Sequence, residues 1–267
     1  MIPAAVRYAR ATDLDHALAL LAAPDAKALA GGQSLIPVMK LRVVRPALVV
    51  DISRLELRGA EIRDDVLHIA PLTTWRELLD ASALERQGLA AIAECVRGIG
   101  DAQVRNRGTI GGSIAHADPA SDMPAVLLAL GASVVARSPE ESRTLALADF
   151  FLGPFTTGLG PHELLVDLTV PLPEAGSGSA YVSVEHPASG FALAGAAALS
   201  GPAGERVALT GVGATPFLLP AGEPSEAIAA VEVYGDSFAP AEYRRHLAAV
   251  VAERALEAAR RRAKEDV

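Results

Sequence analysis

Two glycine pairs constrain the fold of this chain more than any other feature of its sequence. The first lies in Ala30 to Ser34 (AGGQS), directly after a predicted strand, and the second in Thr109 to Ser113 (TIGGS), inside a long polar segment. Paired glycines permit positive φ and close approach of another backbone, so successive N–H groups can converge on an anion. The first pair also leads into a predicted short helix, whose N-terminus favours phosphate. Two interpretations stay open: plain turns, or two halves of a cradle for a diphosphate.

Hydrophobic periodicity predicts an α/β unit over the first fifty residues, in the order strand, helix, strand, loop, short helix, strand. Thr12 or Asp13 can cap the first helix, which carries leucines 14, 18 and 21 on one face, and the strands are expected at KALA and ALVVDI. A second unit begins near Leu57, with short strands at 60–63 and 66–69, a helix that starts at TTW and another at 89–96.

A predicted irregular loop of about twenty-five residues, from Gly98 to Asp122, holds most of the polar groups of the middle third. Such loops inside compact domains are usually functional. Asp118 or Ser121 can cap the helix MPAVLLAL that follows, with Ser121 as the expected cap. Asp122 is then free to accept a hydrogen bond from a ligand amide or ribose hydroxyl. His116 is a further candidate for a direct role, but local spacing ties no carboxylate or nucleophile to it.

The best domain boundary is PLPEAGSGSA, at 171–180, where Pro, Gly and Ser crowd together as in linkers. Beyond it, YVSVEH, FALAGAAAL and VALTGVG are predicted strands. A last helix is expected from near Pro240, capped by Ser237 or Asp236, to about Lys264. Strands followed by helices indicate an α+β C-terminal domain.

Charge and cysteine content exclude several classes of protein. The 267-residue chain has a formal net charge of −8 and only three lysines, so it lacks the electrostatic footprint of a nucleic-acid or anionic-membrane binder. Cys95 is the single cysteine, which rules out an internal disulfide, a cysteine-ligated zinc site or an iron–sulfur cluster held by this chain alone. It lies in the apolar run AAIAECV and is expected to be buried.

The longest apolar stretch, MPAVLLALGASVVA, is interrupted by Gly131 and falls short of the ~20 residues that span a bilayer. Asp13 and Asp15 lie where a signal peptide requires positive charge. We therefore expect a cytoplasmic protein without a membrane span.

Most standard catalytic and cofactor motifs are missing. The chain has no P-loop, HExxH, CxxC or GxSxG pattern, and neither of its two GxG pairs, at Gly98 and Gly211, continues to a third glycine before a helix. No catalytic side chain and no metal site are predicted.

Three ordered segments nevertheless resemble one known family. They are AGGQSLIPVMKLR, then QVRNRGTIGGSIAHADPASDMP, then FFLGPFTTGLGPHELLVDLTVP, and GVGATP is similar to that family's C-terminal domain. Together they resemble the FAD-binding medium subunit of molybdenum hydroxylases of the carbon monoxide dehydrogenase and xanthine dehydrogenase type. The resemblance covers about the first 200 residues.

The resemblance implies an α+β protein in which two α/β subdomains of the vanillyl-alcohol-oxidase (PCMH-like) type clasp FAD, followed by an α+β domain of the CO dehydrogenase flavoprotein type. We expect the first FAD-binding subdomain at 1–55, the second at 56–173 and the C-terminal domain at 174–267.

The resemblance also assigns cofactor-binding residues. The two glycine segments would wrap the FAD diphosphate, Asp122 would contact the adenosine or diphosphate half, and Leu164 and Leu165 would line the adenine or flavin pocket. Phe191 occupies the place of a side chain beside the isoalloxazine ring, although an ordinary core residue is an equal alternative. The full set is Ala30, Gly31, Gly32, Gln33, Ser34, Leu35, Thr109, Ile110, Gly111, Gly112, Ser113, Asp122, Leu164, Leu165 and Phe191.

The stretch YVSVEHPASGF departs from the family pattern. Ser183 stands where relatives commonly have a lysine, His186 and Pro187 where they have basic residues, and Gly190 where they have Asp. A lysine near the flavin would stabilise negative charge on the reduced ring or on a bound nicotinamide nucleotide, so its loss puts NAD as acceptor, and FAD retention, in question. One hypothesis is that His186 replaces part of that charge.

The function implied is an electron-transfer flavoprotein subunit that passes electrons from the 2Fe–2S clusters of a small partner subunit to an external acceptor. A large molybdopterin subunit would oxidise the substrate, and the complex would be a heterohexamer, a dimer of heterotrimers. The alternatives are a freestanding FAD-dependent oxidase and a non-catalytic partner subunit that has lost FAD. Substrate and acceptor cannot be read from the sequence.

Overall fold

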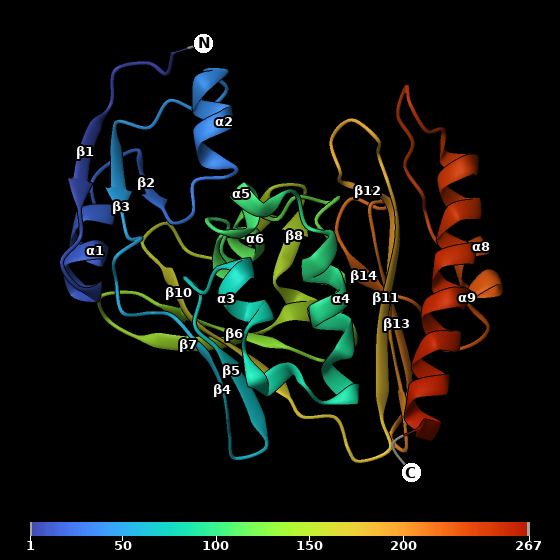
Figure 1. The fold of residues 1–267 in the computed structure, drawn as a ribbon. Coiled ribbons are helices and arrows are strands. Elements are labelled where there is room, and N and C mark those ends of the chain that lie inside the picture. The colour runs from blue at the N-terminus through green and yellow to red at the C-terminus, as the bar shows by residue number, and fades with distance from the viewer. Residues whose placement is uncertain (1, 266–267) are drawn as a thin grey trace.

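The computed structural model describes residues 2–265, which form three sheets in succession along the chain. Figure 1 shows the N-terminal sheet on one side, the helices and sheet of the middle third at the centre, and the C-terminal sheet with its long helix on the other side. Each of the three larger sheets falls within one of the stretches 1–55, 56–173 and 174–267.

The first unit contains a parallel three-stranded sheet in the order β1-β3-β2. Its elements are β1 (Arg7–Arg10), α1 (Leu14–Leu21), β2 (Ala26–Leu29), α2 (Leu35–Lys40) and β3 (Leu48–Asp51). Asp13 caps α1 by accepting a hydrogen bond from the His16 N–H, so Asp13 rather than Thr12 is the cap. The unit thus has the strand and helix order that the periodicity predicted.

The middle unit is an antiparallel five-stranded sheet, β4-β5-β10-β6-β7, with helices packed on one face. The strands are β4 (Ala60–Arg63), β5 (Val66–Ile69), β6 (Ser133–Arg137), β7 (Ser142–Ala146) and β10 (Leu164–Pro171), and a short hairpin is formed by β8 (Phe151–Gly153) and β9 (Thr156–Thr157). The helices are α3 (Trp75–Leu79), α4 (Ala90–Gly98), α5 (Ala102–Arg105), α6 (Ile110–His116) and α7 (Asp122–Ala129), with short 3-10 turns at Ser82–Leu84, Gln87–Leu89 and Leu147–Asp149.

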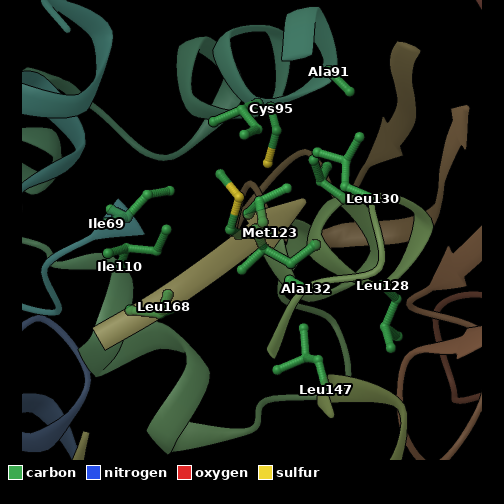
Figure 2. Close-up of a cluster of buried hydrophobic side chains, with 14 of the residues drawn as sticks. Ile69, Ala91, Cys95, Ile110, Met123, Leu128, Leu130, Ala132, Leu147 and Leu168 are labelled. Atoms are coloured by element: carbon green, nitrogen blue, oxygen red, sulfur yellow. The ribbon is translucent and has the colours of Figure 1, made fainter. Parts of the chain in front are cut away.

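The core of this unit gathers around α7, all of whose residues from Met123 to Ala129 are buried. Figure 2 shows Met123 near the centre of the cluster, with Cys95 from α4 above it and Leu168 from β10 to its lower left. Cys95 is buried, as expected, and burial raises the pKa of its thiol well above the ordinary value, with a smaller contribution from the Asp122 carboxylate. Its role is therefore packing.

The C-terminal unit is an antiparallel sheet, β11-β12-β13-β14, between helices on both faces. Its elements are β11 (Gly178–Glu185), β12 (Ala192–Gly201), β13 (Gly204–Thr210), β14 (Phe217–Leu218), α8 (Pro224–Ala229) and α9 (Ala241–Glu265). α9 covers the outer face, and α4 and α7 of the middle unit cover the inner one (Figure 1). β12 (ALAGAAALSG) is made almost entirely of small residues, which lets helices approach both of its faces.

The prediction of one irregular loop from Gly98 to Asp122 is wrong, because the segment contains α5 and α6. Asp101 caps α5 by accepting from the Val104 N–H, and Thr109 caps α6 by accepting from the Gly112 N–H. The short polar residues that favoured a loop are helix caps here. Ser121 occupies the N-cap position of α7, as expected, but its hydroxyl pairs with that of Ser113 at 2.9 Å instead of capping.

In the described part of the chain, no helix is long and apolar enough to cross a membrane.

Candidate functional site

The first glycine segment is a tight connection between β2 and α2. Gly32 has a φ of 78°, which a residue with a side chain rarely adopts. Gly31 is required for a different reason, because a Cβ at this position would lie 2.0 Å from the carbonyl oxygen of Arg107. The segment therefore rests directly on the backbone that joins α5 to α6, about 75 residues further along the chain.

The backbone N–H groups of this segment are unused. Within residues 2–265, those of residues 31 to 34 donate to no protein acceptor. Ser34, at the N-cap position of α2, makes no side-chain capping bond. Successive free N–H groups at a glycine turn before a helix form a concave site for an anion.

In the second glycine segment, by contrast, the backbone N–H groups are already used. This segment is the first turn of α6, and its N–H groups from Ile110 to Ser113 donate within the protein: to the carbonyls of Thr73, Pro71 and Thr109 and to the Thr109 hydroxyl, over 2.9–3.2 Å. A Cβ on Gly111 would lie 2.4 Å from the Pro71 Cβ. This glycine pair therefore allows α6 to pack against the turn after β5.

A cavity of about 140 Å³ separates the two segments. Pockets for whole drug-sized ligands measure about 300–1,000 Å³, so this one suits a part of a large cofactor. Its lining residues are Ala30, Gly31, Ser53, Arg58, Leu72, Thr74, Asn106, Arg107 and Thr109. Three of the predicted residues, Ala30, Gly31 and Thr109, thus meet here.

The other six lining residues were not predicted from the sequence. Arg107 could have been predicted, because it lies within QVRNRGTIGGS, two residues before Thr109. Thr74 could not, because a tertiary bridge brings it beside Thr109. Thr74 forms a capping box with Glu77, whose carboxylate also pairs with the Arg58 guanidinium at 3.0 Å. Burial opposes ionisation of Glu77, but the bonds from Thr74 and Arg58 together hold the pKa of its carboxyl below the ordinary value.

Asp122, the first residue of α7, faces the C-terminal sheet. Its carboxylate accepts a hydrogen bond from the hydroxyl of Tyr181 on β11. Burial raises the pKa of the Asp122 carboxyl to about 6; the Tyr181 bond opposes this shift, and the carboxylates of Glu185 and Asp118 add to it. Gly195 on β12 makes room for the phenol, since a Cβ there would lie 2.3 Å from the Tyr181 oxygen.

The remaining predicted residues lie elsewhere. Leu164 and Leu165 begin β10 and are both buried, the first in the core of the N-terminal unit and the second in that of the middle unit. Neither lines the cavity, nor does Phe191, which is half-exposed at the end of the loop between β11 and β12. His116 ends α6 and packs its ring 5.2 Å from that of Phe155.

His186, in the same loop as Phe191, is hydrogen-bonded to the backbone of that loop. Its Nδ1 accepts the N–H groups of Ala188 and Ser189 at 3.1 and 3.3 Å, and its ring lies 4.1 Å from that of Phe238. Its Nδ1 is therefore occupied by the backbone of its own loop. The hypothesis that His186 replaces part of the lysine charge stays a prediction. Gly190 has a φ of 73°, which explains glycine at this turn.

The residues from 2 to 265 contain no group of three or more His, Cys, Asp and Glu side chains placed to hold a metal ion.

Comparison with known proteins gives this fold and site a family. The model of the FAD binding domain in molybdopterin dehydrogenase matches residues 4–173. The carbon monoxide dehydrogenase medium chain of Hydrogenophaga pseudoflava is 35% identical over 283 residues, covering 97% of this chain and 98% of that one. The glyceraldehyde dehydrogenase medium chain of Sulfolobus acidocaldarius is 42% identical over 199 residues, 74% of this chain and 70% of that one.

A solved structure of carbon monoxide dehydrogenase from H. pseudoflava superimposes with a TM-score of 0.92 at 37% identity, covering 98% of this chain and 99% of that chain. The chain therefore belongs to the family of FAD-binding domains of molybdopterin dehydrogenases. It is an oxidoreductase subunit with FAD as its cofactor, and it has the fold of a carbon monoxide dehydrogenase medium chain along nearly its whole length. The predicted family, fold class and cofactor are confirmed.

Proposed function

We propose that this chain is the electron-transfer subunit of a molybdenum-containing hydroxylase and carries electrons from 2Fe–2S clusters of a partner to an external acceptor. FAD supplies the redox chemistry, and the chain supplies its position and electrostatic surroundings. The observation that carries the proposal is the turn at residues 31–34, whose free N–H groups adjoin a cavity lined by Arg107. No side chain of the site has to act as an acid or base.

The predicted residues would contribute to FAD binding in different ways. The turn at Ala30 to Leu35 provides N–H donors for the diphosphate, and Gly31 keeps that turn against the Arg107 backbone. The segment Thr109 to Ser113 holds the opposite wall in place. Asp122 is the candidate for the adenosine or diphosphate half, since its carboxylate has a second oxygen besides the one that Tyr181 binds.

Leu164 and Leu165 pack into the hydrophobic cores of the N-terminal and the middle unit, respectively, and so hold β10 between them. Phe191 is the candidate ring beside the isoalloxazine, and its half-exposed side chain supports that role.

The partners are a large molybdopterin subunit and a small 2Fe–2S subunit, in a heterohexamer of two heterotrimers. Two matched relatives are named medium chains, which implies larger and smaller companions. The molybdenum cofactor and the clusters lie on those companions, because Cys95 alone cannot hold a cluster. We place the complex in the cytoplasm.

An absorbance spectrum of the purified chain tests the function directly. We expect the yellow spectrum of a flavin, release of FAD on denaturation, and co-purification with a molybdopterin and an iron–sulfur subunit. A colourless protein that takes up no added FAD would contradict the proposal and favour a subunit that has lost its cofactor. Flavin that oxidises a small substrate without partners would favour a freestanding oxidase.

The flavin midpoint potential tests the hypothesis that His186 replaces part of the lysine charge. A lower potential in His186→Ala would support the hypothesis, and an unchanged potential would contradict it. Ser183→Lys, which restores the residue common in relatives, should raise the potential by stabilising the reduced, negatively charged ring.

A further inference from the structure

The segment that leads into α7 is held by the C-terminal sheet. The Thr210 hydroxyl donates to the carbonyls of Pro119 and Ser121 at 2.9 and 2.7 Å, and the Gly211 N–H donates to the Pro119 carbonyl at 2.9 Å. The Ser121 hydroxyl pairs in turn with that of Ser113, in the second glycine segment. The C-terminal unit therefore fixes a segment that also contacts a wall of the proposed FAD site.

Asp122, the next residue, forms no ion pair with the side chains described in residues 2–265. By contrast Glu163, which is likewise partly buried, pairs with the Arg143 guanidinium at 2.6 Å. The charged neighbours of Asp122 are two other acids, Glu185 and Asp118. Enclosed carboxylates are ordinarily paired with a cation, so an unpaired one beside other acids indicates a functional rather than a structural role.

Tyr181 is the side-chain donor to Asp122 in the described part of the chain. Burial raises the pKa of its phenol well above the ordinary value, the Asp122 carboxylate adds to this shift, and a hydrogen bond with Ser183 opposes it. The phenol therefore stays protonated at neutral pH and donates to one Asp122 oxygen. The other oxygen takes no hydrogen bond from the side chains described in residues 2–265, which leaves it for a ligand.

We propose that Tyr181 is a positioning residue for FAD, which orients the Asp122 carboxylate so that its second oxygen accepts a hydrogen bond from a ribose hydroxyl. An acceptor that is already oriented binds more tightly, because less conformational freedom is lost on binding. Tyr181, Thr210 and Gly211 all lie beyond the FAD-binding domain at 4–173, so the C-terminal unit completes the cofactor site. This inference rests on the proposed function, in which Asp122 contacts FAD.

The pH dependence of FAD binding should report on this pair. The Tyr181 bond opposes the upward shift that burial, Glu185 and Asp118 impose on the pKa of Asp122, so its loss should protonate Asp122 at a higher pH. A protonated carboxyl is a weaker acceptor than a carboxylate. The other titratable or charged residues on elements that pack against α7 are Glu94, Cys95 and Arg97 on α4, His116 on α6, Asp149 on the turn Leu147–Asp149, and Glu205 and Arg206 on β13.

Tyr181→Phe tests the inference, because it removes the hydroxyl and keeps the ring. We expect the full chain to bind FAD about tenfold more weakly at pH 7.5, in a titration followed by flavin fluorescence. The matched control is Tyr234→Phe, which removes a phenol that also donates to a carboxylate of the C-terminal unit, that of Glu232 at 3.2 Å. The control should bind FAD within about twofold of wild type, and thermal unfolding should show that both variants are folded.

A double-mutant cycle with Asp122→Ala separates positioning from a purely structural role. If Tyr181 acts through Asp122, adding Tyr181→Phe to Asp122→Ala should change FAD affinity by less than about twofold. The wild-type affinity should fall as the pH drops below about 6, the pKa of Asp122. This fall should begin at a higher pH in Tyr181→Phe and be absent in Asp122→Ala.

Three outcomes overturn the inference alone: equal FAD affinity of Tyr181→Phe and the control, the same loss from Tyr181→Phe with and without Asp122, or a pH profile that Tyr181→Phe leaves unchanged. In each of them the wild-type chain still binds FAD, so the proposed function survives. A wild-type chain that takes up no FAD overturns the proposed function, and this inference with it.

Discussion

The two glycine segments have nearly the same sequence pattern and opposite structural uses. In AGGQS, Gly32 adopts positive φ and the N–H groups of residues 31 to 34 are free. In TIGGS, both glycines lie inside α6, and the N–H groups from Ile110 to Ser113 donate within the protein. The first segment therefore presents donors to a ligand, whereas the second holds a wall of the site in place.

Both glycine pairs therefore allow close packing of the backbone, but only one of them leaves N–H groups free for a ligand. Gly31 and Gly111 each leave space for another backbone, that of Arg107 and that of Pro71. Only the segment that ends outside a helix keeps donors available. Substitutions at the two positions should accordingly separate cofactor binding from folding.

Gly31→Ala should have the largest effect, on FAD binding. The new Cβ would lie 2.0 Å from the Arg107 carbonyl oxygen, so the turn must move and its N–H groups lose their alignment. We expect FAD affinity to fall by about 100-fold or more, equivalent to about 3 kcal/mol, in a titration followed by flavin fluorescence. Gly153→Ala, where no atom lies within 4 Å of the added Cβ, is the control. Normal FAD binding by Gly31→Ala would remove the distinction between the segments.

Gly111→Ala should act on stability instead. Its Cβ would meet the Pro71 Cβ at 2.4 Å and the Pro71 carbonyl at 2.7 Å. Overpacking of this kind costs about 1–3 kcal/mol, which thermal and urea unfolding of the FAD-free chain can measure. The folded fraction should bind FAD with an affinity closer to wild type than Gly31→Ala does. If Gly111→Ala were stable but bound no FAD, the backbone N–H groups that bind the ligand would lie in TIGGS.

Asp122→Asn extends the comparison to the residue beyond Ser121, whose hydroxyl pairs with that of Ser113. The folded-state pKa of about 6 lies above the ordinary 3.8, so the folded chain binds more protons than the unfolded chain between these values. Wild-type stability should therefore fall as pH rises from 4 through 6 and stay lower above it.

Asn cannot ionise, so the variant should gain about 1–2 kcal/mol relative to wild type at pH 8 and little at pH 4.5. Urea unfolding at the two pH values measures the gain. An equal difference in the free energy of unfolding at both pH values would show that Asp122 is not the group responsible for the pH dependence.

Thr109→Ala should have the smallest effect. Its hydroxyl accepts the Gly112 N–H at 3.2 Å, and loss of a helix cap costs about 1 kcal/mol. Thr109→Ser, which keeps the hydroxyl, should recover most of the loss in thermal unfolding. A failure of serine to do so would assign the effect to the Thr109 methyl group.

Local signals predicted the elements well where side chains act within their own segment. Asp13 caps α1, Thr74 caps α3, and the last helix runs from Ala241 to Glu265, close to its predicted ends. The polar segment after Gly98 misled the prediction, because the caps Asp101 and Thr109 belong to residue types that also favour loops.

The sequence alone determined the family, the cofactor and the absence of any cysteine-held cluster, since ordered motifs and a single cysteine need no coordinates to be recognised. Only the tertiary structure decided which glycine pair offers donors, because that depends on whether distant carbonyls such as those of Pro71 and Thr73 take the N–H groups first. It also brought Arg58, Thr74 and Arg107 to one cavity and directed the N–H groups of Ala188 and Ser189 at His186 Nδ1. These properties arise from contacts between segments far apart in the chain, and no local pattern encodes them.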